Sequence, residues 1–262
     1  MPEHLCVAAI YRITQLHAAH RGGINAAVDA EIRGVAKTNR ASPHTIANEV
    51  IAARIGATLG LPIPAGVVAE HSGELYYLSL DVSKEGKTLP PIIASDFAAN
   101  QPRYAAGCVA FDVLIANCDR NPANLSLDPA FNPPRASLFD HGHALLGTGA
   151  PIGSDRLVAA VGTLGCDGRP PVNGSRHVLL DYIASSDDLL RWADRIAHLP
   201  SFVIEDACRE AADLGLFADP ALARELAAWL EARAGKIHEL ISDNTDEFKS
   251  INQWQLYWRS PS

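Results

Sequence analysis

The stretch from residue 104 to residue 142 constrains the fold of this chain more than any other part of it. Apolar side chains recur there at spacings of four, three and four residues, at Tyr104, Cys108, Phe111 and Ile115, which predicts a helix with one buried face. A polar loop follows, and a short apolar segment then ends in Asp140, just before Gly142. The chain is therefore expected to run from a buried helix through a polar loop into a strand that ends in an acid and a glycine turn.

Three polar side chains in this stretch have a spacing that suits chemistry on a nucleotide. Asp119 and Asn124 lie five positions apart in the loop, and Asp140 comes sixteen residues after Asn124. Phosphoryl transfer from ATP needs one carboxylate beside the attacking hydroxyl, and one Asn with one Asp to hold Mg²⁺ on the phosphates. Mg²⁺ is a hard cation that takes few protein oxygens and keeps phosphates and waters as its other ligands. The order and context of the three residues therefore predict a phosphoryl-transfer site.

The N-terminal third is expected to hold short strands around one helix. Residues 31–38 and 74–82 have strand-like composition and are bounded by Gly or polar breaks, which predicts two strands. Between them, Ser42 is the expected N-cap of a helix that has Pro43 in its first turn. The helix is expected to end near Gly60, because two prolines follow closely.

Lys37 and Glu49 are the candidates for positioning a nucleotide in this N-terminal part. Lys37 ends the first strand, and Glu49 lies on the helix among apolar neighbours at helical spacing. An acid in that position is costly to bury unless it is paired, and Lys37 is the expected partner. A kinase-like site needs such a strand Lys to bind the α- and β-phosphates and such a helix Glu to orient it. The alternative is that Lys37 is solvated and that Glu49 pairs with Arg40 or Arg54 on the helix surface.

Backbone groups at two further places are expected to contact the nucleotide. Gly22 and Gly23 separate two strand-like runs, and glycines there would let backbone N–H groups approach phosphate oxygens. An ordinary hairpin turn explains the same two glycines equally well. Leu78 and Leu80 lie late in the second strand, where their backbone groups are suitably placed to hydrogen-bond the edge of an adenine.

The rest of the chain is expected to be mainly helical, which predicts an α+β fold with two lobes. Residues 83–100 are polar and turn-rich and are interpreted as a linker, while residues 141–176 are Gly- and Pro-rich and are interpreted as a long loop. Helical patterns then return at 185–198, 200–214 and 219–242. The predicted lobes are a small β-rich one over residues 1–82 and a larger, mostly helical one over residues 83–262.

Composition and charge exclude several classes of protein. With 22 Lys+Arg against 30 Asp+Glu, the net charge is −8, which argues against nucleic acid as the main ligand. No stretch reaches the roughly 18 consecutive apolar residues that would suggest a membrane span. The 5 cysteines are scattered and form no CxxC pair, so neither a disulfide framework nor a zinc ribbon is expected. The expected location is therefore the cytoplasm, where thiols stay reduced.

Several segments together resemble the bacterial HipA-like kinases, and most closely their short HipA-related branch. They are VAKT, ANEVIAARIGATLGLPIPAG and NCDRNPANL…ASLFDHGHAL, and the similarity extends from about residue 20 to about residue 242. More remotely, the chain is similar to phosphatidylinositol 3/4-kinases, which share an Asp-Arg-x-x-x-Asn loop and an Asp-x-Gly turn.

The resemblance implies a two-lobed protein-kinase-like fold that uses ATP and Mg²⁺. It implies that Asp119 is the catalytic acid/base, that Asn124 and Asp140 are the metal ligands, and that Lys37 and Glu49 position the nucleotide. The expected activity is phosphorylation of a protein Ser/Thr hydroxyl, as in kinases of toxin–antitoxin systems. The identity of the acceptor is left open.

Three other functions remain open from the sequence. The same Asp/Asn/Asp triad serves lipid and small-molecule kinases, because fold and triad do not reveal the acceptor. A kinase fold can also hold nucleotide without turnover. The third alternative is a metal-dependent hydrolase, in which His141 and His143 would bind zinc together with Asp119 or Asp140.

Overall fold

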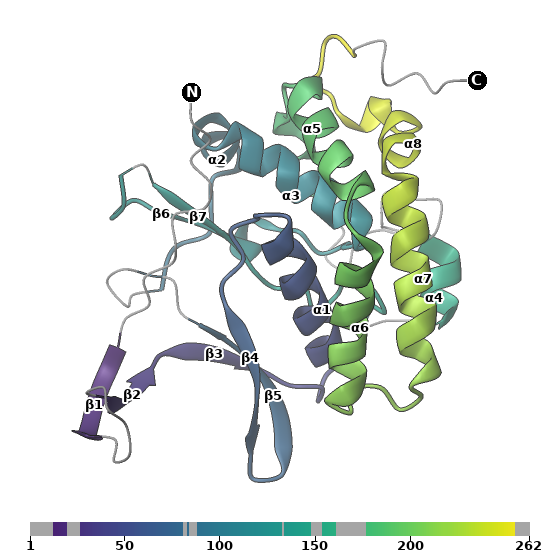
Figure 1. The fold of residues 1–262 in the computed structure, drawn as a ribbon. Helices are drawn as coiled ribbons and strands as arrows, with labels where there is room; N and C mark the ends of the chain where they lie inside the picture. Colours follow the sequence, from purple (N-terminus) through teal and green to yellow (C-terminus); the bar gives the residue numbers. More distant parts are fainter. Residues whose placement is uncertain are drawn as a thin grey trace.

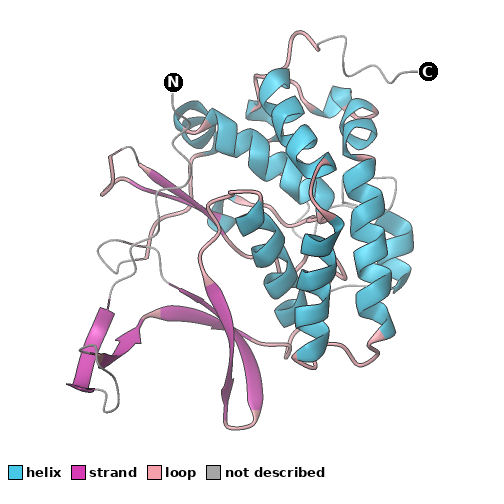
Figure 2. Ribbon diagram, viewed as in Figure 1, coloured by secondary structure: helices cyan, strands magenta, loops and turns pink. Residues whose placement is uncertain are grey.

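The computed structural model of the chain describes residues 13–19, 27–80, 83, 88–132, 134–147, 154–160 and 177–254. Strands gather at one end of the molecule and helices fill the other, so that an antiparallel sheet meets a helical body (Figures 1 and 2). Among the described helices, none is long and apolar enough to cross a membrane. Among the described cysteines, Cys108, Cys118 and Cys208, none forms a disulfide.

The strand-rich end contains two separate sheets. The first pairs β1 (Ile13–Ala19) with β2 (Val28–Ile32), and the second has the order β3-β5-β4, with β3 (Gly34–Lys37), β4 (Gly66–His71) and β5 (Glu74–Leu80) all antiparallel. The strand predicted over 74–82 is confirmed as far as Leu80, and the next two residues lie outside the described part of the chain.

The prediction of a single strand over 31–38 is wrong. The strand is interrupted at Arg33, and the two parts, β2 and β3, belong to different sheets. Gly34 explains where the second sheet begins. A Cβ at this position would lie 2.7 Å from Leu78 Cδ1 and 2.8 Å from the Ser79 carbonyl oxygen. Only a glycine lets the start of β3 approach β5 this closely.

Helix α1 (Thr45–Thr58) follows β3 and carries Glu49 on a buried face. The predicted cap is wrong: the helix begins at Thr45, and the buried Ser42 hydroxyl makes no hydrogen bond. The side chain of Asn39 accepts the N–H of Ile46 at 2.9 Å instead, so a residue well before the helix satisfies its first turn. The predicted end is confirmed at Gly60, which has a φ of 78° after the last helical turn.

The helical body begins with α2 and continues to the end of the described chain. Its elements are α2 (Ala94–Asn100), α3 (Pro102–Leu114), η1 (Pro122–Asn124), β6 (Leu125–Asp128), β7 (Arg135–Leu138), α4 (Ser154–Ala160), η2 (Leu180–Tyr182), α5 (Ser186–Ala197), α6 (Ser201–Asp213), α7 (Ala221–Gly235), α8 (Ile237–Ser242) and η3 (Thr245–Glu247). The buried stripe predicted over residues 104–115 is the inner face of α3, where Cys108, Phe111 and Ile115 are fully buried.

Three predictions for this body need correction. The segment predicted as a linker contains α2, which Phe97 anchors in the core with no exposed surface. The segment predicted as a long loop contains α4, from which Leu157 is buried. The helix predicted over 219–242 is split at Lys236, directly after Gly235, which is a weak helix former.

Helix α1 lies between the sheet and the helical body (Figure 1). It packs on β4 and β5 on one side and on α6 on the other. Arg54 on α1 also forms a two-point ion pair with Glu210 on α6, with distances of 2.7 and 2.6 Å. The helix that carries Glu49 is therefore held by both parts of the molecule.

Candidate active site

A cleft of about 330 Å³ lies between the β3–β5 strands and the β6–β7 hairpin. Its strand wall includes Val35, Lys37 and Leu80, and the opposite wall includes Asp140 and His141. Asp119 and Asn124 are not among the residues that line it. The hairpin register nevertheless brings Asn124 beside the Asp140 wall. Leu125 pairs with Leu138, so the residues on either side of the hairpin, Asn124 and Phe139, lie together, and the Phe139 N–H donates to the Asn124 carbonyl at 3.2 Å.

Lys37 joins the two sides of the cleft. Its Nζ donates to Glu49 Oε1 at 2.5 Å and to Asp140 Oδ1 at 2.8 Å, and 21% of its side chain is exposed. The predicted pairing of Lys37 with Glu49 is thus present in the structure. The alternative partners of Glu49 are engaged elsewhere, because Arg40 pairs with Glu74 and Arg54 with Glu210.

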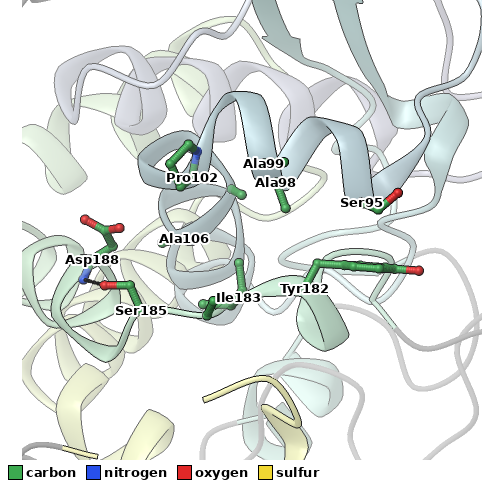
Figure 3. A pocket seen from close by; sticks show the side chains of 11 residues that line it. Ser95, Ala98, Ala99, Pro102, Ala106, Tyr182, Ile183, Ser185 and Asp188 are labelled. Atoms are coloured by element: carbon green, nitrogen blue, oxygen red, sulfur yellow. Dashed lines mark hydrogen bonds between the residues drawn. The ribbon is translucent and has the colours of Figure 1, made fainter. Parts of the chain in front are cut away.

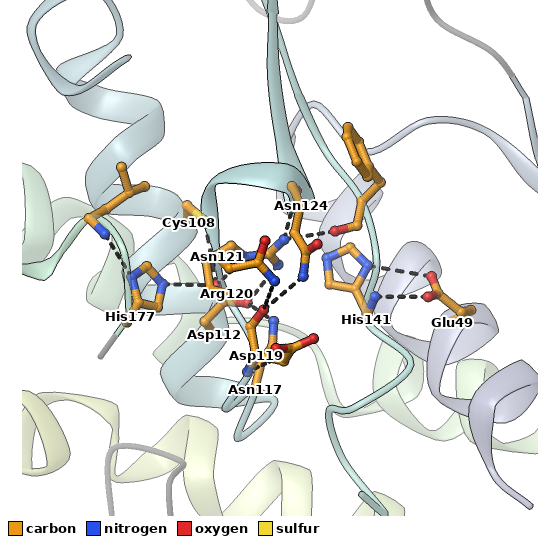
Figure 4. Close-up of polar contacts among 12 residues, drawn as sticks. Glu49, Cys108, Asp112, Asn117, Asp119, Arg120, Asn121, Asn124, His141 and His177 are labelled. Carbon is orange, nitrogen blue, oxygen red and sulfur yellow. Dashed lines mark hydrogen bonds and ion pairs between the residues drawn. The ribbon is translucent and has the colours of Figure 1, made fainter. Parts of the chain in front are cut away.

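Glu49 is 3% exposed and is held by three contacts. Besides Lys37, the backbone N–H of His141 donates to its Oε1 at 2.8 Å, and His141 Nδ1 lies 3.6 Å from its Oε2 (Figure 4). Burial raises the pKa of this carboxyl, but the hydrogen bond from His141 and the charge of Lys37 outweigh it and lower the pKa to about 2. Glu49 is therefore a carboxylate at neutral pH.

The same cluster keeps Lys37 charged. Burial lowers the pKa of its ammonium, yet the charges of Glu49 and Asp140 more than compensate and leave that pKa raised above its ordinary value. The Lys37 ammonium is therefore a positive charge in the cleft wall at neutral pH. Phosphate oxygens could replace the Asp140 carboxylate as its second hydrogen-bond partner.

Asp140 sits on a backbone that few residues adopt. Its φ is 64°, in the left-handed region where Asp is among the better tolerated non-glycine residues, and 42% of its side chain is exposed. The turn after it is tied to α1, because Asn48 Nδ2 donates to the Gly142 carbonyl at 2.8 Å and Asn48 Oδ1 accepts the Leu146 N–H at 3.3 Å. The surrounding contacts thus hold Asp140 in this conformation.

The loop after α3 presents Asp119 and Asn124. The Asn124 amide nitrogen donates to the Asp119 carbonyl at 2.7 Å, which leaves the amide oxygen as the atom suited to a cation. The Asp119 N–H is accepted by Asn117 Oδ1 at 3.1 Å (Figure 4). An amide oxygen on a 4% exposed residue and the accessible carboxylate of Asp140 are hard oxygen donors, and this donor set fits Mg²⁺.

Two residues that the sequence analysis missed hold this loop in place. Asp112 on α3 and Arg120 in the loop are both buried and form a two-point ion pair, with distances of 2.7 and 2.9 Å (Figure 4). The remaining guanidinium nitrogen, Nη1 of Arg120, donates to the carbonyls of Asn124 and Phe139 at 3.0 and 2.7 Å. The sequence does contain a signal for this pair. Asp112 lies among apolar residues in a predicted helix, and Arg120 directly follows Asp119.

The remaining nucleotide contacts predicted from the sequence have different outcomes. Gly22 and Gly23 lie outside the described residues. Leu80 lines the cleft, although its N–H already donates to the Ala65 carbonyl at 2.9 Å, whereas Leu78 does not line it. Leu78 lies inside the central strand, paired with Ala36 on one side and Val67 on the other, so the sheet takes up its backbone groups. We therefore leave Leu78 out of the candidate site.

The hydrolase alternative finds no support in the described residues. His141 is 1% exposed, packs edge-on against Phe111 with ring centroids 5.8 Å apart, and contacts Glu49. Within the described ranges, the one group of three ligating side chains close enough to share an ion is Cys108, Asp112 and His177.

That group is a poor metal site as well. The Arg120 guanidinium already occupies both oxygens of Asp112. Burial, together with the charge of Asp112, raises the pKa of the Cys108 thiol well above its ordinary value, so this side chain does not supply a thiolate.

A second cavity, of about 340 Å³, lies between α2, α3 and the segment around η2 (Figure 3). Its lining consists mostly of Ala, Pro and Ile side chains, with Ser95, Tyr182 and Asp188 at its edges. Phosphate groups need cations or aligned N–H donors, and the only charged side chain in this lining is an acid. The cleft beside Lys37 is therefore the better candidate for a nucleotide.

Comparison with known proteins shows which known fold the chain has. No model of a protein family and no curated protein sequence matches the chain. The crystal structure of the proinflammatory kinase CtkA from Helicobacter pylori superposes with a TM-score of 0.57 at 13% identity, over 89% of this chain and 95% of that one. The chain has the two-lobed fold of that kinase. HipA of the Shewanella oneidensis MR-1 HipA–HipB–operator DNA complex also matches, with a TM-score of 0.41 and 13% identity, over 97% of this chain and 70% of that one.

The likeness to CtkA confirms the α+β, two-lobed kinase-like fold predicted from the sequence, and at 13% identity it is a statement about fold. The resemblance to HipA-like kinases inferred from the motifs agrees with it at that level.

Proposed function

We propose that this protein is an ATP- and Mg²⁺-dependent phosphotransferase that acts on a hydroxyl group. The observation that carries the proposal is the position of Lys37 Nζ, between Glu49 and Asp140 in the wall of a cleft, in a chain with a kinase fold. A partly buried lysine that is oriented by one acid, close to a second and more exposed acid that could hold Mg²⁺, is the arrangement that binding of ATP phosphates requires.

The nucleotide is proposed to lie in the cleft with its phosphates toward Lys37. Charge-assisted hydrogen bonds from the ammonium to phosphate oxygens would replace the present contact with Asp140. The apolar side chains of Val35, Ile63 and Leu80 line the same cleft and offer the surface that an adenine ring prefers.

Asn124 and Asp140 are the proposed metal ligands. When bound there, Mg²⁺ would supply charge neutralisation on the phosphates. Once Lys37 has turned to a phosphate, Asp140 has both carboxylate oxygens available, and the Asn124 oxygen is already oriented because its amide nitrogen is used by Asp119.

Asp119 is proposed to accept the proton of the acceptor hydroxyl. The hydroxyl oxygen forms a bond to the γ-phosphorus, the bond from that phosphorus to the bridging oxygen of ADP breaks, and the hydroxyl proton passes to the Asp119 carboxylate. The Asp119 backbone supports this role, because Asn117, Asn121 and Asn124 all hold it by hydrogen bonds. A backbone held in this way limits the positions that the Asp119 carboxylate can take when the acceptor binds.

The proposed acceptor is a Ser or Thr hydroxyl of a protein, in the cytoplasm. The motif resemblance to HipA-like kinases supports this choice, while a lipid or small-molecule hydroxyl would use the same three residues.

Incubation with γ-labelled ATP, Mg²⁺ and cell lysate tests the proposal. We expect label on Ser or Thr of a protein, and no transfer when Mg²⁺ is omitted. Label in the lipid or small-molecule fraction would keep the kinase and replace the acceptor. Mg²⁺-dependent ATP binding with no labelled product would make the protein a binding module, and tightly bound zinc in the purified protein would favour the hydrolase.

A further inference from the structure

The carboxylate of Asp112 collects donors from three separate parts of the chain (Figure 4). From the loop after α3, which we call the catalytic loop (residues 116–124), Arg120 pairs with it and Asn117 Nδ2 donates to its Oδ1 at 2.9 Å. Cys108 on α3 donates its S–H to Oδ2 at 3.5 Å, and His177 Nε2 lies 2.9 Å from the same oxygen. Asp112 is 1% exposed, so these donors replace its water shell. Burial raises its pKa, but the charge of Arg120 and the hydrogen bonds of Arg120 and His177 hold that pKa far below its ordinary value.

Through two of these donors, Asp112 sets the position of all three residues proposed for the chemistry. Asn117 donates to Asp112 and accepts the N–H of Asp119. Arg120 pairs with Asp112 and donates to the carbonyls of Asn124 and Phe139, and Phe139 directly precedes Asp140. A shift of the Asp112 carboxylate would therefore reach Asp119, Asn124 and Asp140 together.

Another of these donors, His177, comes from a part of the chain far away in sequence. Its Nδ1 accepts the N–H of Leu179 at 3.2 Å, so the ring proton is on Nε2 and is donated to Asp112. The next residue adds a second contact, since the Val178 N–H donates to the Arg120 carbonyl at 3.0 Å. Two consecutive residues thus fasten this segment to the catalytic loop, one through its side chain and one through its backbone.

We infer that His177 is a positioning residue for phosphoryl transfer, which acts on the catalytic loop through Asp112 and Arg120 and touches no reacting group itself. The inference rests on the proposed function for its effect on rate. It makes a specific claim about which step suffers most. The rate of transfer should fall further than Mg·ATP affinity, because Asp119 belongs to this network and the Lys37–Glu49 pair does not.

The test compares two substitutions of the same residue. His177→Leu keeps the bulk of the ring and removes its proton donor, whereas His177→Gln restores one donor and one acceptor at a similar reach. We expect His177→Leu to lower kcat by about 10-fold or more, because misplaced catalytic groups are costly. Mg·ATP affinity should fall by a smaller factor, because Lys37 and Glu49 keep their contacts while the metal ligands Asn124 and Asp140 shift. His177→Gln should recover most of kcat.

Hydrogen–deuterium exchange of the backbone over residues 117–124 gives a readout that needs no activity. Exchange there should be faster in His177→Leu and close to wild type in His177→Gln. His238→Leu is the matched control, because His238 on α8 makes a similar 2.9 Å contact with Asp194 on an exposed surface. It should change neither kcat nor exchange in the loop.

The outcomes separate this inference from the function on which it rests. If wild type transfers no phosphate, the proposed function fails, and the exchange measurement alone decides the inference. Unchanged loop exchange in His177→Leu would overturn it, and so would a loss of Mg·ATP affinity as large as the loss of kcat.

Discussion

At the scale of single residues, the account depends on three charged groups that share a small space. One ammonium, Lys37, is bound by a buried carboxylate and by a more exposed one. The buried partner, Glu49, is paired with groups of the protein alone. The more exposed partner, Asp140, could exchange its contact with Lys37 for one with a metal ion bound to a nucleotide. In the proposed function, the two acids therefore have different roles: Glu49 orients Lys37, and Asp140 binds the metal.

Replacing Lys37 should weaken nucleotide binding. Lys37→Ala removes the cation that would face the phosphates, and a lost charge-assisted hydrogen bond of about 1.5–3 kcal/mol corresponds to roughly 10- to 100-fold in affinity. Titration calorimetry with Mg·ATP measures this, and thermal unfolding alongside it shows whether the variant is folded. Lys236→Ala, at an exposed position after α7, is the matched control and should bind as wild type does. Unchanged affinity and unchanged turnover in Lys37→Ala would remove Lys37 from the site.

Glu49 should give the protein a specific acid sensitivity. Its folded-state pKa of about 2 lies below the ordinary 4.5, so its ionised form stabilises the fold above about pH 5, and this contribution is lost as pH falls toward 2. The shift corresponds to roughly 3 kcal/mol at neutral pH. The free energy of unfolding of wild type should therefore exceed that of Glu49→Gln, by a margin that narrows by about 2 kcal/mol between about pH 5 and pH 3. A margin that does not change with pH would contradict the assignment.

At the scale of elements, the arrangement of helices decides how firmly the site is held. Helix α1 packs on α6 as well as on the sheet, and the Arg54–Glu210 pair joins the two helices. Because that ion pair is largely exposed, its own contribution is small. Burial of the apolar side chains of α1 contributes more to holding the helix in place. Glu49 is thus presented to Lys37 by a helix that the helical body fixes.

Close packing of α3 against α5 gives a prediction at this scale. A Cβ on Gly107 would lie 2.4 Å from Trp192 Cε2, and the indole is held in place by its hydrogen bond to the Arg103 carbonyl at 2.7 Å. Gly107→Ala should destabilise the protein by about 1–3 kcal/mol through overpacking, although alanine is the better helix former. Gly235→Ala, with nothing within 4 Å of its added Cβ, should be neutral or stabilising by up to about 1 kcal/mol. Denaturant unfolding of the two variants checks both, and equal stabilities would refute the packing argument.

The sequence predicted these elements unevenly, for physical reasons. Helix α3 and strand β5 follow from local periodicity, and the Lys37–Glu49 pairing follows from the cost of burying an acid. The break at Arg33 could not be predicted, because it depends on the close approach of Gly34 to β5. The start of α1 was misplaced because Asn39, several residues upstream, satisfies Ile46 while Ser42 does not act as a cap. Asp112 and His177 were missed because their partners are distant in sequence or unknown until the loop is folded.

At the scale of the whole molecule, the cleft is lined by residues from four elements. They are Lys37 of the sheet, Glu49 of α1, Ala123 of the loop after α3, and Asp140 of the turn after β7. The fold is that of a kinase, and Lys37, Glu49 and Asp140 line the cleft. The fold brings together motifs that are far apart in the sequence. Lys37 and Asp140 are separated by 103 positions in the chain, yet Lys37 Nζ lies 2.8 Å from Asp140 Oδ1.

The central claim is that Asp119 performs chemistry while Asp140 holds the metal, and one paired measurement tests it most directly. Mg·ATP affinity by titration calorimetry and phosphoryl transfer from labelled ATP are measured on wild type, Asp119→Asn and Asp140→Asn. Asp119→Asn should bind Mg·ATP as wild type does and lose about 10²–10⁴ in transfer rate, whereas Asp140→Asn should lose both. Transfer by Asp119→Asn at the wild-type rate would contradict the account.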